Sequence, residues 1–279
     1  MNIKHLHPYS FLKLKPAITP IRRRGVRLAF LLPQVAILAS ILTAGAEWSI
    51  VSATGLGEPA PNVEVIETHC VNGNQTARVT ALCFNDKNHT LRVIDSPSPG
   101  TATLANTLNH AKAVGGVNGG YFHKDYRPVG LMISDGKTIH GFEKAKLLSG
   151  LVGVRQDGLV SILRSGEYDS GKSQLLQALQ CGPMLVENDQ LVPGLNDERI
   201  ARRTIVGKGT RGETALIYIS SVTLADAARI LALPAILDTW KPRTAINLDG
   251  GSSSGLWAEN GISLAEIVRV RNFLAIVPR

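Results

Sequence analysis

The stretch AINLDGGSSSG, residues 245–255, joins a short apolar run, typical of a buried β-strand, to a turn of glycines and serines. Asp249 lies at the junction, so a strand there would place a carboxylate at the edge of the turn. Glycines let main-chain N–H groups approach a ligand closely, and serines add hydroxyl donors. Two interpretations stay open from this stretch alone: a tight strand-to-helix connection, or the floor of a small ligand pocket.

Most of the remaining chain carries the pattern of antiparallel strands. Asp-Gly turns at residues 135–136 and 157–158 predict hairpins, which build antiparallel rather than βαβ sheets. Helical spacing predicts short helices at 103–113, 173–180 and 223–233, with Thr103 and Thr223 as N-caps. We therefore expect an α+β fold, a mostly antiparallel sheet with two or three packed helices. The strands are expected at 63–68, 77–84, 90–94, 114–122, 128–134, 151–155, 159–163, 182–186, 200–206, 215–220, 245–249 and 273–277.

The formal net charge of +8 is concentrated at the N-terminus. Residues 1–27 hold seven basic and no acidic side chains, and the remaining residues carry 23 basic and 22 acidic ones. A near-neutral body lacks the basic surface that nucleic-acid binding requires, so we expect no nucleic-acid partner.

An apolar run at residues 28–46 follows the basic segment and ends in Ala44-Gly45-Ala46. This order is typical of a secretory signal peptide, and the length also allows an uncleaved membrane anchor. We expect residues 1–46 to form one or the other, residues 47–61 a linker and residues 62–279 the folded domain. Both interpretations place the domain outside the cytoplasm, in the periplasm, in the extracellular space or facing it from a membrane. Contact with the membrane is expected only through the N-terminal segment.

The cysteine and histidine residues give little indication of a disulfide, a metal site or a catalytic triad. Cys70 and Cys83 lie on two expected strands of one hairpin and could form a disulfide, whereas Cys181 is expected to be a buried free thiol. The seven histidines show no metal-ligand spacing, and no G-x-S-x-G elbow is present. We therefore expect no metal and no cofactor.

Residues 166–173, GEYDSGKS, match the phosphate-loop pattern G-x-x-x-x-G-K-S. Two observations argue against a nucleotide site. Glu167 and Asp169 would place negative charges inside a loop that wraps polyphosphate, and the neighbouring hairpins do not suit a parallel nucleotide-binding sheet. We do not expect an NTPase.

Five motifs occur in a characteristic order along residues 100–279. They are VNGGYF at 117–122, P-x-G-L at 128–131, Q-x-G-P-x-L-V at 180–186, R-T-x-x-G at 203–207 and N-L-D-G-G-x-S-S at 247–254. Together they resemble the phosphodiester glycosidase family, although Ser252 stands where that family usually has a third glycine. The resemblance implies an exported hydrolase with a single catalytic domain that cleaves a sugar from an anomeric phosphodiester. It also implies that Gly119, Gly182 and Thr204 bind substrate.

Chemistry suggests roles for individual residues. Departure of a phosphate from a sugar builds a second negative charge, which the Arg203 guanidinium could stabilise; the alternative is an ordinary surface arginine. Asp249 could attack the anomeric carbon or activate water. No second carboxylate can be assigned, and Asp125 and Glu143 are the weak candidates.

Five further residues complete the expected substrate site. The N–H groups of Gly250 and Gly251 and the Ser253 hydroxyl could bind phosphate oxygens. Asn118 and Asn247 could bind sugar hydroxyls or orient Asp249. The expected partner is a glycan or sugar phosphodiester. A non-catalytic envelope module that binds a glycan or phospho-glycan through the same pocket stays open as the alternative.

Overall fold

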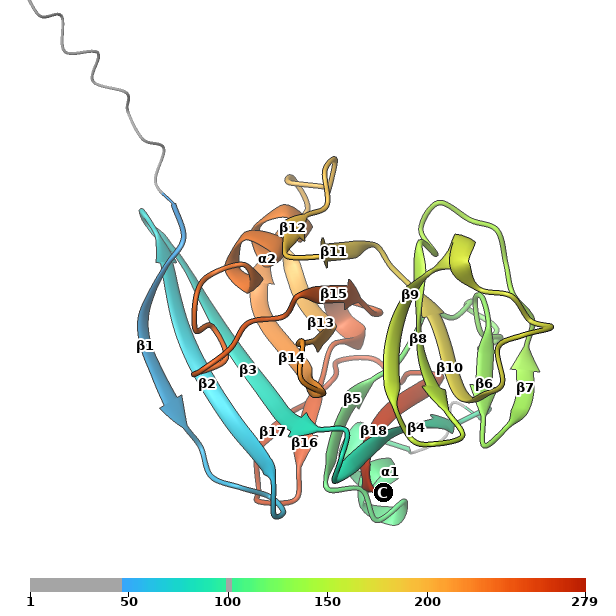
Figure 1. Cartoon of the computed structure of the whole chain (residues 1–279). Helices are drawn as coiled ribbons and strands as arrows, with labels where there is room; N and C mark the ends of the chain where they lie inside the picture. The colour runs from blue at the N-terminus through green and yellow to red at the C-terminus, as the bar shows by residue number, and fades with distance from the viewer. Residues whose placement is uncertain (1–46, 99–101) are drawn as a thin grey trace, which may run out of the picture. The chain divides into compact units, whose positions relative to one another are not determined.

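Eighteen β-strands in three sheets form the framework of the residues that the computed structural model describes, 47–98 and 102–279 (Figure 1). All the strand pairs in the three sheets are antiparallel, as the hairpin turns predict. The expected signal peptide or anchor at residues 1–46 lies outside the described residues. Among the described residues, no helix has the length and apolar character needed to cross a bilayer.

The first sheet has eight strands in the order β1-β2-β3-β14-β13-β15-β11-β12. The part of the chain expected as a linker, residues 47–61, contains its edge strand β1, which pairs with β2. The strands are β1 (Ser49–Gly55), β2 (Val63–Asn72), β3 (Gln75–Asn85), β14 (Glu213–Val222), β13 (Ala201–Lys208), β15 (Thr244–Asn247), β11 (Met184–Glu187) and β12 (Gln190–Leu191).

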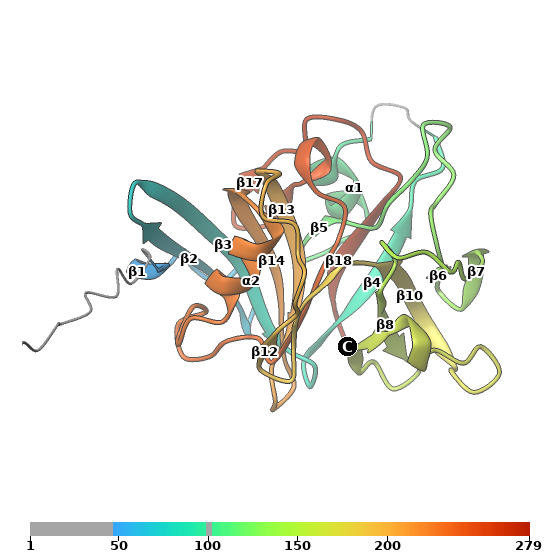
Figure 2. The same ribbon diagram turned by 90° about the horizontal axis from the view of Figure 1, so that it is seen from above.

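The second and third sheets have five strands each. Figures 1 and 2 place strands β4 and β18 of the third sheet between β1–β3 and the second sheet. The second sheet consists of β7 (Lys137–His140), β6 (Met132–Ser134), β10 (Leu175–Cys181), β8 (Gly150–Arg155) and β9 (Val160–Arg164). The third consists of β17 (Ser263–Leu264), β16 (Leu256–Ala258), β5 (Gly115–Asn118), β18 (Asn272–Pro278) and β4 (His89–Asp95).

One hydrophobic core joins the three sheets. Apolar side chains from each sheet pack in a single cluster, and burial of this apolar surface holds the sheets together. Members of this cluster are Val65 and Leu82 from the first sheet, Val152 and Leu179 from the second, and Val117 and Leu274 from the third.

The expectation of an α+β fold is wrong, because the described residues are mostly β and contain two short α-helices, α1 (Leu104–His110) and α2 (Leu224–Leu231). Both helices lie where helical spacing predicts them, and Thr103 and Thr223 cap them by accepting hydrogen bonds from main-chain N–H groups. Helix α2 packs its apolar side on the first sheet, and α1 packs on the third.

The third expected helix, at residues 173–180, is instead strand β10, in the middle of the second sheet between β6 and β8. The strand is buried on both faces, so its apolar run has no alternation that would distinguish it from a buried helix. The buried amide of Gln177 accepts a hydrogen bond from the main-chain N–H of Val93 at 3.1 Å, which ties β10 to β4. Tertiary contacts of this kind override local propensity.

All three cysteines are buried and free. Cys70 lies opposite Ala77 in the β2–β3 ladder, and Cys83 lies opposite Glu64. The two thiols are therefore about six residues apart along the ladder, or roughly 20 Å at the rise of a β-strand. The disulfide considered between them does not form. Burial raises the pKa of the Cys70 thiol to about 11, so it is not poised as a thiolate.

A buried ion pair connects the first sheet to the second. The Asp86 carboxylate, which follows β3, binds the ammonium of Lys208 on β13 and accepts a hydrogen bond from the Thr214 hydroxyl at 2.7 Å. The same carboxylate accepts a hydrogen bond at 3.1 Å from the N–H of Val160, the first residue of β9. Removal of one partner of such a pair leaves an uncompensated buried charge.

We predict that Lys208→Ala lowers the free energy of unfolding by about 3 kcal/mol, because it leaves the buried Asp86 carboxylate without a cationic partner. Lys172→Ala is the matched control. Lys172 pairs with Asp169 on the surface, where its side chain is 88% exposed, and its loss should cost less than about 1 kcal/mol. Urea unfolding of both variants measures the difference, and equal losses would contradict the burial of the Lys208–Asp86 pair.

Candidate active site

Segments from the first and third sheets and the connection between β10 and β11 meet at the stretch that follows β15. Main-chain hydrogen bonds fix the arrangement: Asp249 N–H donates to Gly119 O at 3.1 Å, and Leu248 N–H donates to Thr204 O at 2.8 Å. Asn247 N–H donates to Pro183 O at 3.0 Å. The structure thus brings together four motifs that lie far apart in the sequence, with β11, β15 and β13 as neighbours in the first sheet (Figure 1).

The side chain of Asn118, at the end of β5, is fully buried and uses its whole amide within the protein. Its Nδ2 donates to Asp249 O at 2.8 Å, and its Oδ1 accepts from the Thr204 hydroxyl at 2.7 Å and from Gly255 N–H at 3.1 Å. Of the two roles considered, sugar binding and orientation of Asp249, these contacts fit orientation. Thr204 is likewise occupied by Asn118.

The buried Asn247 and the partly buried Tyr121 form a second group around Gly182. The Tyr121 hydroxyl donates to Gly182 O at 2.5 Å, and Asn247 Nδ2 donates to the same carbonyl at 3.2 Å. A Cβ atom on Gly182 would lie 2.3 Å from the carbonyl oxygen of Leu147, so no larger residue fits there. Among the described residues, Asn247 Oδ1 is buried and has no hydrogen-bond partner. It is the polar atom of this group that is left for a ligand or a water molecule.

The glycine-serine turn forms a short 3-10 segment, η2 (Gly251–Ser253), after Gly250. Gly251 has φ +67°, a left-handed conformation that favours glycine, as the sequence predicts. Arg202 holds the turn: its Nε donates to Gly251 O at 3.0 Å and its Nη2 to Ser252 O at 3.1 Å. The carbonyl groups of the turn are therefore bound to Arg202.

The Asp249 carboxyl lies against this turn and is partly buried. Burial raises its pKa above the usual range of an aspartate, whereas hydrogen bonds from the Ser253 side chain and the Gly250 main chain, and the nearby charge of Arg199, act in the opposite direction. Ser253 and Gly250, expected as phosphate donors, thus contact the carboxyl of Asp249.

The Arg203 guanidinium is buried, with 6% of the residue exposed, which excludes an ordinary surface arginine. Its Nε donates to Val222 O at 3.0 Å and its Nη2 donates to Arg199 O. Its Nη1 faces Gly250, where a Cβ atom would lie 3.8 Å away. Burial and the neighbouring Arg199 lower the pKa of Arg203, but an arginine stays charged. None of the carboxylates in the described residues forms an ion pair with it.

The two weak candidates for a second carboxylate have other partners. Asp125 is exposed and pairs with Arg127 at 2.7 Å. Glu143 accepts a hydrogen bond from Gly130 N–H at 3.1 Å and lies 3.5 Å from His140 Nδ1. Neither carboxylate hydrogen-bonds to a residue of the candidate site.

Four residues around the site were missed by sequence reasoning: Tyr121, Arg199, Arg202 and Asn272. Asn272, on β18, accepts a hydrogen bond from Gly120 N–H at 2.7 Å, and a Cβ atom on Gly119 would lie 1.9 Å from its Oδ1. Gly119 is therefore required by packing against Asn272. Tyr121 and the two arginines lie within or beside the quoted motifs, so closer attention to neighbouring positions could have found them, whereas Asn272 carries no such signal.

Neither the phosphate-loop pattern nor the possible metal ligands among the described residues form a site. The GKS segment at 166–173 begins in a single 3-10 turn (Ser165–Glu167) and leads into strand β10, not into the helix that a phosphate loop requires. Within residues 47–98 and 102–279, no three His, Cys, Asp or Glu side chains cluster as a metal site would.

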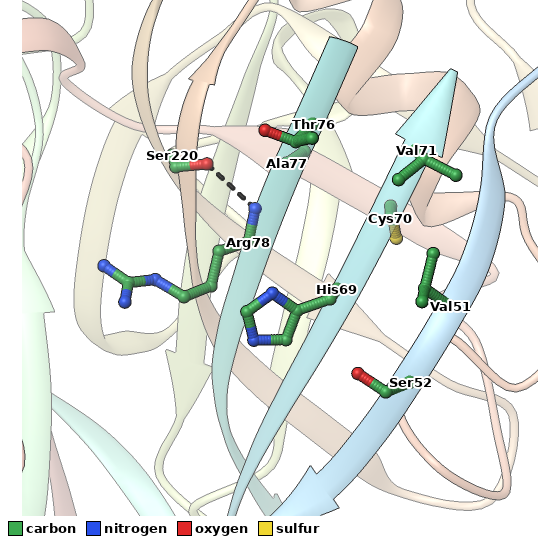
Figure 3. Close-up of a pocket in the computed structure, with 9 residues that line it drawn as sticks. All are labelled: Val51, Ser52, His69, Cys70, Val71, Thr76, Ala77, Arg78 and Ser220. Atoms are coloured by element: carbon green, nitrogen blue, oxygen red, sulfur yellow. Dashed lines mark hydrogen bonds between the residues drawn. The ribbon is translucent and has the colours of Figure 1, made fainter. Parts of the chain in front are cut away.

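A surface hollow of about 660 Å³ lies over strands β1, β2 and β3 (Figure 3). His69 and Arg78 line it, and both side chains lie near the Glu67 carboxylate, at 3.1 and 3.9 Å. None of the predicted site residues lines this hollow.

The sequence of the chain was compared with family models and with curated proteins. A family model described as phosphodiester glycosidase matches residues 111–277, more than half of the chain. No curated protein sequence matches the chain significantly.

Several solved structures share the fold, among them the following three. A hypothetical protein from Synechocystis aligns with a TM-score of 0.62 at 15% identity, covering 79% of this chain and 63% of its own. The zebrafish N-acetylglucosamine-1-phosphodiester alpha-N-acetylglucosaminidase catalytic domain, described as auto-inhibited by its pro-peptide, aligns at 0.56 and 18% identity over 86% of this chain and 85% of its own. A Burkholderia pseudomallei protein described as exported aligns at 0.51 and 12% identity, covering 77% and 74%.

At sequence identities of 12–18%, these similarities show a common fold alone. This chain spans less than two thirds of the Synechocystis protein. The family match covers β5, the connection between β10 and β11, β13, β15 and η2, which carry the candidate site. This chain therefore belongs to the phosphodiester glycosidase family.

Proposed function

We propose that the chain is an exported hydrolase that releases a sugar from a sugar-1-phosphodiester. Family membership supports the reaction class. The observation that carries the proposal at this site is the buried Arg203 guanidinium, which has no carboxylate partner among the described residues and whose Nη1 faces Gly250. Buried charges in proteins are normally paired, so an unpaired buried cation points to an anionic ligand.

The chemistry follows from the charge that develops in the reaction. When the bond between the anomeric carbon and its oxygen breaks, the electron pair leaves with the phosphate, which then carries a second negative charge. A guanidinium fixed beside that oxygen stabilises this state more than the ground state, so it lowers the barrier. Arg203 is held by two main-chain carbonyls and therefore does not need to reorganise.

Asp249 supplies the carboxylate on the sugar side. In its ionised form it either attacks the anomeric carbon or takes a proton from the water that does so. Its hydrogen bonds from Gly250 and Ser253 orient it, and Asn118 fixes the main chain beneath it at 2.8 Å. We propose that Asn247 contacts the substrate through its free Oδ1. We further propose that Thr204, Gly119 and Gly182 shape the pocket and that Gly251 gives the phosphate close access to the main chain.

Export is part of the proposal because of the sequence of residues 1–46, which has the order of a signal peptide or an anchor. A fold neighbour described as exported is consistent with it. The alternative is an envelope module that binds a phospho-glycan without cleaving it. That alternative draws support from the fact that neither Asp125 nor Glu143 joins Asp249 as a second carboxylate.

A turnover assay separates these two functions. The purified chain should release free sugar from a sugar-1-phosphodiester, and Asp249→Asn should lower turnover at least about 10³-fold because the amide cannot act as a base or nucleophile. Free sugar is measured over a panel of sugars. Binding of the same compounds without release, or full activity in Asp249→Asn, would favour the binding module.

Arg203 is tested through two substitutions. Arg203→Ala should lower kcat/KM by about 10²–10³, and it should also cost about 1–3 kcal/mol of stability because Val222 O and Arg199 O lose their donor. Arg203→Lys keeps the charge and should recover part of kcat/KM. Kinetics are measured at a temperature at which urea unfolding finds each variant folded. Equal kcat/KM in all three proteins would remove Arg203 from the reaction.

The raised pKa of Asp249 predicts a link between stability and pH. The folded state holds the Asp249 proton more tightly than the unfolded state, so the contribution of this group to stability is lost as pH rises from about 4 through its folded pKa. Asp249→Asn removes this loss. Its unfolding free energy should match that of the parent chain near pH 4 and exceed it at pH 7. Thermal unfolding over this range measures the gap, and a variant less stable at pH 7 would contradict the burial of the carboxylate.

A further inference from the structure

Eight large apolar side chains are well exposed in the described residues, and four of them belong to segments whose main chain contacts the candidate site. Isolated exposed apolar residues are normal, but a group at one place on a monomer marks a binding surface. We define the apolar rim as Leu147, Ile200, Ile267 and Val268, which are 50%, 60%, 75% and 40% exposed. The other four, Val51, Leu56, Leu159 and Leu191, lie on other loops and edges.

Ile267 and Val268 lie on the glycine-serine turn. Their N–H groups both donate to the carbonyl of Ser252, at 2.8 and 3.2 Å. Arg202 binds the same carbonyl, and it also donates to Ala265 O at 3.1 Å, so the whole segment is fastened to η2. Ile267 is nevertheless the most exposed of the eight side chains.

Leu147 and Ile200 reach the site from two other loops. The carbonyl of Leu147 lies so close to Gly182 that a Cβ atom there would be 2.3 Å from it. Ile200 follows Arg199, whose carbonyl accepts a hydrogen bond from Arg203 Nη2. The rim therefore draws on the loops before β8, before β13 and after β17, and each is fixed by its contacts with a site residue.

Charge complements this apolar surface. Arg199 is exposed beside Ile200, and Arg203 presents its unpaired charge within the site. A ligand that fits both features carries a phosphate and, next to it, a hydrocarbon chain. Two parts of the rim adjoin the proposed phosphate site. Ile200 follows Arg199, whose carbonyl binds Arg203, and the N–H groups of Ile267 and Val268 bind the carbonyl of Ser252, next to Gly251. A hydrocarbon chain that extends from the phosphate would meet these residues, on the phosphate side of the bond that breaks.

We propose that the apolar rim binds the hydrocarbon chain of a lipid aglycone, so that the substrate class is a sugar-1-phosphodiester of a lipid. This inference rests on the proposed function for the site itself. Each methylene group that the rim covers should contribute about 0.8 kcal/mol, or roughly fourfold in affinity. Covering two or three methylenes then gives a preference of more than about tenfold over a short aglycone.

Binding tests the rim without relying on turnover. Decyl phosphate, below the concentration at which it forms micelles, and methyl phosphate are titrated into the chain by calorimetry. Decyl phosphate should bind at least about tenfold more tightly, and the double variant Ile267→Ser/Val268→Ser should lose most of that ratio. Leu159→Ser, an exposed leucine in the turn between β8 and β9, is the matched control and should keep the ratio.

Turnover then separates the two proposals. The kcat/KM for a decyl sugar-1-phosphodiester should exceed that for the methyl compound by a similar factor, and the double variant should narrow the difference. Equal binding of the two phosphates, or binding of neither, overturns the lipid assignment. Either result would be expected if the rim contacts another protein instead of a lipid. Tighter binding of decyl phosphate with no sugar released from either compound supports the rim and overturns the proposed hydrolysis.

Discussion

The side-chain amide of Asn118 is the contact on which the candidate site depends. It joins β5 to the Thr204 hydroxyl on β13, to the carbonyl of Asp249 and to the N–H of Gly255. The amide is fully buried, so each bond that is lost would leave an unpaired polar group in the interior. This requirement holds the third sheet against the first at the point where the Asp249 carboxylate is presented.

The antiparallel character of the fold could be predicted from the sequence, because hairpin turns and strand patterns are local signals. The Asp135-Gly136 turn is an example: both residues have positive φ, as a tight hairpin demands. The identity of β10 could not be predicted in the same way. It pairs with β6 and β8 inside its sheet and contacts β4 of the third sheet, and all three partners lie far from it in the sequence. The division into three sheets, and with it the mostly β class, likewise depends on pairing that no local pattern encodes.

That the candidate residues lie close together was easier to predict than their contacts. Asp249, Arg203, Asn118 and Asn247 do lie together, because strand ends and turns leave a recognisable pattern of polar and small residues. Their contacts are set by neighbours from other parts of the chain. Gly119 is small because Asn272 occupies the space beside it, and burial of Arg203 follows from carbonyls contributed by Val222 and Arg199.

We propose that the bond to the anomeric carbon breaks while Arg203 holds the departing phosphate. Hydrolysis of a sugar-1-phosphodiester in water enriched in ¹⁸O tests this directly, because the label marks the atom that water attacks. Mass spectrometry of the two products should place the label in the released sugar and leave the phosphate unlabelled. Label in the phosphate would mean that water attacks phosphorus, and would contradict the account.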